Sequence, residues 1–283
     1  GFDNIENVDL FKKEDDKKPS ENETEEKKED PKSFLYLKKV NCPVCGKVNY
    51  VIAVKTGANR VLKRDSDTFI RYDGLPEVNP YFYDVWICNF CGYSAMKSDF
   101  LKLRSFQIDL IKKNISPKWK GKEYPDIYDA KIAIERYKLS LLNYYVDDAK
   151  SSQKAMNCLK LAWMYRLLKK HDSEIGFLKK AVEGFKDSYY NENFPIYGMD
   201  RFTIMYMIGE LSRRIGNNED ALMMFSQVIT TPGVSEKVKE QARTQKDILK
   251  EDEKAARAEA EAEQSSDEDE QNNKKGFFSK LFK

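Results

Sequence analysis

Four cysteines in two pairs are the residues of this chain whose types and spacing best support chemistry. Cys42 and Cys45 stand in "CPVC", Cys88 and Cys91 stand in "CNFC", and a glycine follows each pair. A CxxC turn brings two thiolates to one side of a tight loop, and the glycine can adopt a positive φ that turns backbone N–H groups toward the sulfurs. Two such turns supply the tetrahedral set of four sulfurs that Zn²⁺ prefers in closed structural sites. We therefore predict a structural zinc site at these four residues, without an open position for catalysis.

The spacing leaves other uses of the four cysteines open. Iron in a rubredoxin-like site takes the same ligands, so the sequence favours zinc without excluding iron. A thioredoxin-like redox pair needs a CxxC that opens a helix after a strand, whereas each pair here is followed by glycine in strand-like surroundings. Four reduced cysteines without a metal are the remaining alternative, which the doubled pattern disfavours.

The segment between the pairs must return the second turn to the first. Short β-branched and aromatic runs with Gly or Asn-Pro between them predict strands, at "FLYLKKV", "VNYVIAVKT", "NRVLKR" and "FYDVWIC". This is the arrangement of a zinc ribbon, and we assign residues 34–105 to a zinc-binding β module. At about 70 residues one small core is marginal, and a structural metal often adds the missing stability.

Charged residues near the pairs have candidate roles in this module. Four lysines lie close in sequence to the cysteines and either offset the charge of the thiolates or are plain surface residues: Lys38, Lys39, Lys47 and Lys55. Arg64, Asp65 and Asp67 predict a polar network or a salt-bridged turn. Tyr83 and Asp84 precede the second pair, where they either contact its surroundings or serve packing.

No nucleophile–base set accompanies the cysteine pairs. The single histidine, His171, lies in "KKHDSE" at a junction of predicted helices, where an exposed loop residue is expected. Cys158 falls on a helical segment and is expected to be a small core residue. We predict no catalytic residues and a protein that is not an enzyme.

The period of the apolar residues changes from two to three and four after about Ser98, which predicts helices. One stripe follows Pro125 and consists of Ile127, Ala130, Ile134, Tyr137, Leu141 and Tyr145. Two further stripes and three more helical segments follow, so residues 106–250 form a predicted helical, repeat-like domain. The fold class is therefore α+β, with a small zinc-ribbon-like β module before an α-helical array.

The array has features of a tetratricopeptide repeat. Ile208-Gly209 stands where that pattern places a large-small pair at a close helix crossing, and Pro232 stands near the expected helix end. The matching face of the second helix carries Ala221, Phe225 and Val228, and a weaker copy lies about 47 residues earlier at Leu161-Ala162, Leu178 and Ala181. "DSYYNENFPIYGM" would be an extra loop between the copies, whose aromatic residues could line a groove. An ordinary helical bundle is the alternative.

The stretches "YLKKVNCPVCGK", "VLKRDSDTF" and "NPYFYDVWICNFCGYSA", with the helices beyond, resemble an uncharacterised bacterial family, domain of unknown function 2225. The resemblance covers roughly residues 34–250. Its most specific parts are Arg-Asp-Ser-Asp at 64–67 and Tyr-Asp-Val-Trp at 83–86, which leads into the second cysteine pair. The resemblance implies a metal-binding β module followed by a helical array, and it implies no established activity.

Charge is distributed unevenly along the chain. Residues 1–33 carry a net charge of −5 and residues 251–272 carry −8, whereas 273–283 carry +4, which leaves +11 for residues 34–250 in a chain of net charge +2. We predict a disordered acidic tail at 1–33 and an acidic linker at 251–272, because neither holds enough apolar residues to form a core. The first part of the linker, "EDEKAARAEAEAE", has a high helix propensity but no apolar stripe, so the sequence also allows the last helix to continue into it. A basic body is compatible with an anionic partner, and equally with a lysine-rich solvated surface.

Residues 273–283, "NKKGFFSKLFK", form a basic-aromatic terminal motif whose apolar residues recur at helical spacing. It is expected to make weak, reversible contact with an anionic membrane surface, to enter a groove, or to remain an inert tail. The sequence has no run of 18 apolar residues and no secretion signal, so a cytoplasmic protein, peripheral to the inner face of the membrane at most, is expected.

These features together predict a non-enzymatic zinc-binding adaptor that recognises a protein or peptide partner through its helical array. One alternative is a nucleic-acid-binding protein that uses the zinc ribbon and the basic body, although acidic tails would compete with phosphate. A second alternative is a thiol redox protein or another enzyme. The sequence does not specify the oligomeric state.

Overall fold

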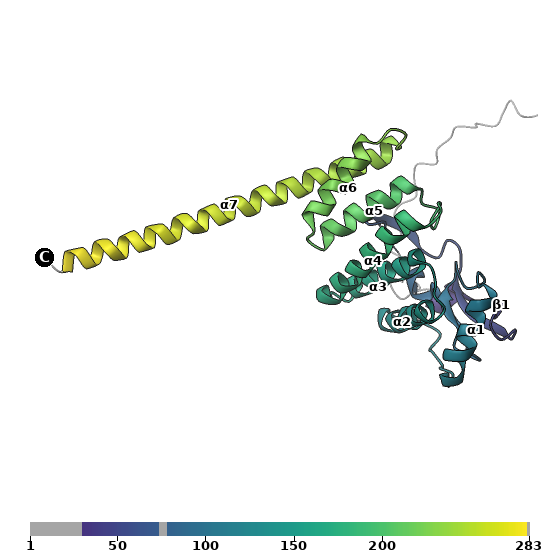
Figure 1. The fold of residues 1–283 in the computed structure, drawn as a ribbon. Coiled ribbons are helices and arrows are strands. Elements are labelled where there is room, and N and C mark those ends of the chain that lie inside the picture. Colours follow the sequence, from purple (N-terminus) through teal and green to yellow (C-terminus); the bar gives the residue numbers. More distant parts are fainter. Residues whose placement is uncertain (1–29, 74–77, 282–283) are drawn as a thin grey trace, which may run out of the picture. The chain divides into compact units, whose positions relative to one another are not determined.

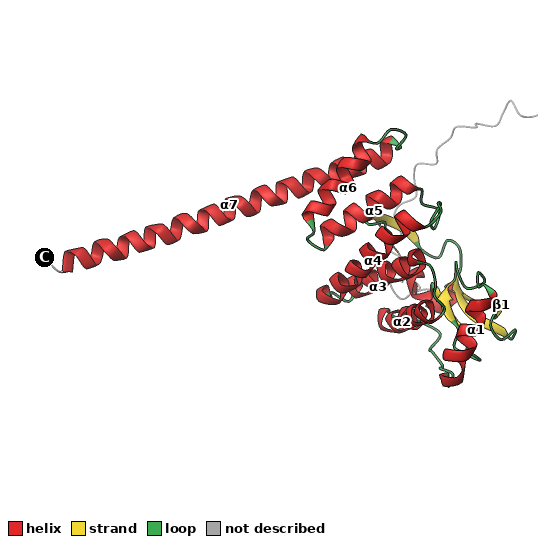
Figure 2. Cartoon of the chain, viewed as in Figure 1, coloured by secondary structure: helices red, strands yellow, loops and turns green. Residues whose placement is uncertain are grey.

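The computed structural model describes residues 30–73 and 78–281, with side-chain surroundings described as far as residue 258. The predicted acidic tail at 1–33 therefore lies almost entirely outside the described residues. Strands come first along the chain and helices follow, as Figures 1 and 2 show. The predicted α+β class, with a ribbon-like β module before a helical part, is confirmed.

The β module consists of three antiparallel two-stranded pairs (Figure 2). Their strands are β1 (Leu35–Asn41) with β2 (Val48–Val54), β3 (Arg60–Arg64) with β4 (Ile70–Asp73), and β5 (Val85–Ile87) with β6 (Ser94–Met96). The sequence predicted β1, β2, β3 and β5 but not the short β4 and β6. The first part of "FYDVWIC" belongs to the 3-10 helix η4 (Pro80–Tyr83), because Asn79 caps it by accepting from the backbone N–H of Tyr81 at 3.0 Å. A second such turn, η2 (Pro31–Phe34), precedes β1.

Seven α-helices follow within the described residues. They are α1 (Ser105–Asn114), α2 (Ala130–Val146), α3 (Ser151–Leu167), α4 (His171–Asn191), α5 (Arg201–Arg214), α6 (Asn218–Thr230) and α7 (Glu236–Leu281), with the 3-10 helix η5 (Ser116–Lys118) between α1 and α2. Side-chain caps explain several starts. Asp129 accepts from the N–H of Ile132 at 2.7 Å, so α2 begins later than Pro125 suggested. Asp200 caps α5 in the same way through Thr203.

Consecutive helices pack as pairs, α3 with α4 and α5 with α6, and small residues allow the close approach (Figure 1). A Cβ added to Gly209 would lie 2.9 Å from Cε1 of Phe225, which confirms the predicted close crossing at Ile208-Gly209. Gly184 of α4 plays the same part against Ala155 of α3, where a Cβ would meet another Cβ at 2.9 Å. These contacts leave no space for larger side chains at the two crossings.

The strands around the second cysteine pair share a core with α2. The Tyr144 hydroxyl of α2 accepts from the N–H of Met96 in β6 at 3.0 Å. The buried Arg136 guanidinium donates to the Val85 carbonyl at 2.7 Å, and its cation lies 4.5 Å from the Tyr128 ring centroid. The β module and the first helices are thus packed together, and the described residues from Pro31 onward belong to one unit.

Three helical expectations need correction. Helix α4 continues to Asn191, so Tyr189 and Tyr190 lie on a helix, and the loop before α5 is shorter than predicted. Tyr145, assigned above to an apolar stripe, is 78% exposed because α2 turns that side away from the core. Helix α7 runs to Leu281, through the part of the predicted linker that the sequence allowed to be helical and also through "QSSDEDEQNN", which was predicted as linker alone. Ala and Glu make up more than half of the segment 251–272, and their high helix propensity does not require an apolar face.

The side chains of the terminal motif at 273–283 lie outside the described part. None of the described helices combines the length and the apolar character that crossing a bilayer requires.

Candidate metal centre

The four cysteine sulfurs converge at one point between two hairpin turns. The Sγ atoms of Cys42 and Cys91 are 3.6 Å apart, as are those of Cys45 and Cys88, and all four lie within 4.8 Å of one another. Four thiolates about 2.3 Å from a tetrahedral Zn²⁺ would be about 3.8 Å apart, close to the two shorter separations. A disulfide needs about 2.05 Å, and all five cysteines are free. The donor set therefore fits a single metal ion, as predicted.

The two turns have the same hydrogen bonds although they belong to different hairpins. In the β1–β2 turn the N–H of Cys42 donates to Lys47 O at 3.0 Å, and Gly46 N–H donates back to Cys42 O at 2.9 Å. In the β5–β6 turn Cys88 N–H donates to Tyr93 O and Gly92 N–H donates back to Cys88 O, both at 2.8 Å. Both glycines have positive φ, 73° and 76°, which glycine adopts at little cost. The repeat of CxxCG is thus a repeat of one backbone structure.

Because the four cysteines are largely buried, their thiols need a positive charge beside them to ionise together. Cys42, Cys88 and Cys91 are at most 5% exposed, and Cys45 is partly exposed. On their own the sulfurs do not ionise together: contact with Cys42 lowers the pKa of Cys88, and contact with Cys88 raises the pKa of Cys42 to about 12. A divalent cation would stabilise all four thiolates at once. Because all four ligands come from the protein, such an ion would be held in a closed, structural site.

The surroundings do not match a redox dithiol. Cys91 is followed by the strand β6 and Cys45 by β2, so neither pair opens a helix. A helix start after a strand is what lowers the pKa of a thioredoxin-like cysteine. Cys158, the fifth cysteine, lies apart on α3, is 4% exposed, and has its pKa raised to about 11 by burial, as expected of a core residue.

Two of the four lysines named near the cysteines contact aromatic rings, and the acidic residue before the second pair forms ion pairs. Lys38 lies 5.2 Å from the Trp86 ring centroid, and Lys47 lies 4.6 Å from that of Phe90. Asp84 is 4% exposed and forms ion pairs with Lys160 of α3 and, at 3.2 Å, with Lys97. Burial opposes the ionisation of Asp84, but these two ammonium groups outweigh it and lower its pKa. Its role is to anchor the β module on α3.

Tyr83 also serves packing rather than the cysteines. Its ring stacks on Tyr128 with centroids 4.6 Å apart. Its hydroxyl accepts from the backbone N–H of Tyr128 at 2.9 Å. Of the two roles considered for Tyr83 and Asp84, the structure therefore shows the packing role.

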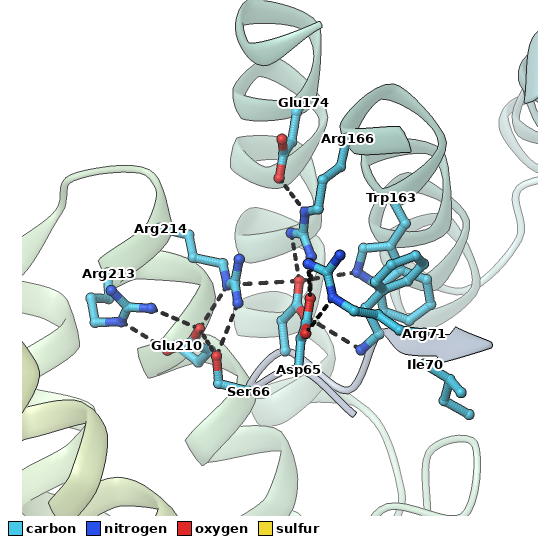
Figure 3. A network of polar contacts seen from close by, with 12 residues as sticks. Asp65, Ser66, Ile70, Arg71, Trp163, Arg166, Glu174, Glu210, Arg213 and Arg214 are labelled. Atoms are coloured by element: carbon cyan, nitrogen blue, oxygen red, sulfur yellow. Dashed lines mark hydrogen bonds and ion pairs between the residues drawn. The ribbon is translucent and has the colours of Figure 1, made fainter. Parts of the chain in front are cut away.

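Asp65, Ser66 and Asp67 of the Arg-Asp-Ser-Asp stretch form a polar network, as predicted for the two aspartates, and Figure 3 shows that the network reaches the helices. Asp67 lies in the β3–β4 turn, is fully buried, and accepts from Arg166 Nη2 at 2.6 Å and Trp163 Nε1 at 3.1 Å. Asp65 receives two hydrogen bonds of 2.9 Å from Arg71 of β4. Arg64 is exposed and takes no part. The turn is thereby fixed to α3.

A second half of the network joins the same turn to α5 (Figure 3). Ser66 donates to Oε1 of the fully buried Glu210 at 2.6 Å, and Arg214 donates to both, at 2.9 Å to Ser66 Oγ and 2.7 Å to Glu210. Arg213 also pairs with Glu210, and its Nε donates to Glu210 Oε2 at 2.9 Å. Sequence reasoning missed Glu210 and Arg214; the signal was an acid four residues before an arginine on an otherwise apolar helix face.

His171 is exposed, as predicted, but it is the first residue of α4 and not a loop residue. No nucleophile–base pair involving it is seen among the described residues.

Comparison with known proteins gives one match. A family model described as "Uncharacterized protein conserved in bacteria" (DUF2225) matches residues 35–249. No curated protein and no solved structure matches the chain.

Proposed function

The chain belongs to this uncharacterised bacterial family, and we propose that it is a non-enzymatic adaptor in which a structural zinc site stabilises a surface for binding another protein. The observation that carries the proposal is the closed set of four buried or partly buried cysteines at the ends of two matched turns. A set without an open ligand position stabilises structure and does not activate water or substrate. Zinc is favoured over iron because four-cysteine ribbons with this turn are a common zinc geometry.

The helical part supports a role in recognition. Helices α3 to α7 pack as successive pairs, an arrangement that leaves side chains of one face available to a partner. Five free cysteines suit a reducing compartment, and we place the protein in the cytoplasm on that ground. A thiol redox activity is not favoured, because neither cysteine pair opens a helix.

Site-specific crosslinking in the native cell tests the adaptor proposal with the intact chain. A photo-reactive residue replaces Met223, which is 47% exposed on α6, and in a second version Tyr190, which is 71% exposed on α4. The expected result is that the same partner protein is crosslinked from both positions. The crosslink should disappear when the cells also express an excess of the chain without the photo-reactive residue. Crosslinks to nucleic acid alone, lost on nuclease treatment, would favour the nucleic-acid alternative that the basic body suggests and would overturn the adaptor proposal.

A further inference from the structure

An apolar groove lies beside the second cysteine turn. It measures about 690 Å³, and its lining comes from that turn, the end of α1, η5 and α2: Gly92, Asn114, Ile115, Lys118, Trp119, Leu139, Leu142, Asn143, Tyr145 and Val146. Leu142 is 50% exposed and Tyr145 is 78% exposed. Two such side chains three positions apart on one helix, beside a groove, form an apolar surface that no described element covers.

The charged residue that lines this groove is a lysine, and more lysines stand in the stretch beside it. The stretch 110–122, which carries the wall from α1 to beyond Trp119, holds five lysines and no acidic residue: Lys112, Lys113, Lys118, Lys120 and Lys122. Only Lys122 forms an ion pair with a described residue, at 2.5 Å from Glu135. Lys118 lines the groove itself. An occupant with negative charge and apolar anchors would be complementary to both features.

The cysteine site holds the opposite wall in position. Trp119 donates through Nε1 to Asn89 O at 2.8 Å, within the CNFC turn. Its ring lies so close to Gly92 that an added Cβ would be 2.7 Å from its Cγ. Lys122 N–H donates to Asn89 Oδ1 at 2.7 Å. Loss of the turn's structure would therefore release this wall of the groove.

We propose that this groove binds an acidic peptide segment of a partner protein, anchored by one or two large apolar side chains, and that the cysteine site keeps the groove in shape. The inference rests on the proposed adaptor function and names the surface at which the partner would bind. A peptide is favoured over a nucleic acid because four lining side chains are aliphatic: Ile115, Leu139, Leu142 and Val146. Bases stack on flat rings, but Gly92 covers part of the Trp119 ring, so Tyr145 offers the one exposed ring of the lining against four aliphatic side chains.

Selection from a display library of random twelve-residue peptides, on the immobilised full-length metal-loaded chain, tests the proposal. Enriched sequences should combine Asp or Glu with Leu, Ile, Phe or Trp. The most enriched peptide is then synthesised and measured by fluorescence anisotropy. The double variant Leu142→Asp/Tyr145→Ala should weaken its binding at least tenfold, and Lys118→Glu should weaken it severalfold.

A matched control distinguishes the groove from general surface effects. Leu101→Asp/Tyr50→Ala replaces residues that are 63% and 65% exposed outside the groove, and its affinity should stay within twofold of the unsubstituted chain. Enrichment of basic peptides, or equal binding by the two double variants, would overturn the groove assignment. If peptide binding is lost only on substituting exposed residues of α4 or α6, this inference fails and the adaptor function stands. If nothing is enriched while single-stranded RNA binds and Leu142→Asp/Tyr145→Ala removes it, both fail.

Discussion

Asp67 and Arg166 are 99 positions apart in the sequence, and their side chains meet in a 2.6 Å hydrogen bond between opposite charges. Asp67 is fully buried and the Arg166 side chain is 15% exposed, so water screens the pair little. Burial opposes the ionisation of Asp67, but the bond from Arg166 and the charge of Arg214 outweigh it and lower its pKa. This pair links the β3–β4 turn of the cysteine module to the helices.

Asp67→Asn should lower the free energy of unfolding by about 3 kcal/mol, because it removes the fully buried carboxylate to which Arg166 donates and leaves Arg166 with the less buried Glu174 and Asp65. Urea unfolding monitored by circular dichroism measures the loss. Asp126→Asn is the control: Asp126 pairs with Lys32, the two side chains are 67% and 59% exposed, and less than about 1 kcal/mol should be lost. Equal losses in the two variants would contradict the role assigned to Asp67.

The metal site was predictable because its signal is local: two CxxCG turns specify both ligand identity and backbone geometry. The fold class followed from the change in apolar period. The network was predictable only in part. Asp65 and Asp67 stand together in the sequence, whereas their partners Arg166, Glu210 and Arg214 come from helices whose packing no local pattern specifies.

The groove could not be predicted at all. Periodicity placed Tyr145 on the apolar stripe of α2, but a stripe tells only which residues share a face and not whether a neighbour covers it. Here the buried side of α2 faces β5, β6 and α3. The side that carries Leu142 and Tyr145 borders the groove, whose other wall includes Trp119, and no described helix or strand covers it. An exposed apolar side chain in a predicted core position was the sign of the candidate binding surface.

Asp147→Asn should stabilise the protein at neutral pH. Burial raises the pKa of Asp147 to about 6, against an ordinary value of 3.8. The folded state therefore binds the Asp147 carboxyl proton more tightly than the unfolded state does. Above pH 6 the ionised carboxylate lowers the free energy of unfolding, and this loss of stability diminishes as the pH falls from 6 toward 3.8. A pKa unit is worth about 1.4 kcal/mol and partial hydration reduces it, so the gain is on the order of 1–2 kcal/mol at pH 7.5.

The gain from Asp147→Asn should be smaller at pH 5.0, where the folded-state carboxyl is mostly protonated. Urea unfolding at the two pH values checks this. Asp148→Asn, at the exposed neighbouring position, shows how much comes from removing a charge in this loop. A gain from Asp147→Asn that is independent of pH, or largest at pH 5.0, would show that burial is not the cause.

Gly209→Ala and Gly176→Ala should have opposite effects, although both glycines lie inside helices. At Gly209 the new Cβ would lie 2.9 Å from Phe225 Cε1 and 3.0 Å from Met224 Cβ, and overpacking there should cost about 1–3 kcal/mol. At Gly176 no atom lies within 4 Å, so alanine should add about 0.5–1 kcal/mol through its higher helix propensity. Thermal melts of the two variants compare them directly, and a stabilising Gly209→Ala would contradict the close packing of α5 on α6.

Cys88→Ser should abolish metal binding, whereas Cys158→Ala should leave it unchanged. Both cysteines are buried, but only Cys88 belongs to the four-sulfur cluster. Elemental analysis of the purified chain should find about one zinc, because four thiolates complete one tetrahedral site. Structural zinc contributes about 10–16 kcal/mol of apparent folding energy in small zinc-binding peptides, so Cys88→Ser should melt the cysteine module. Since Asp67 and Asp84 join that module to α3 and α5, the helices should lose stability with it. Iron in place of zinc, or a folded chain that holds no metal, would overturn the assignment of a structural zinc site.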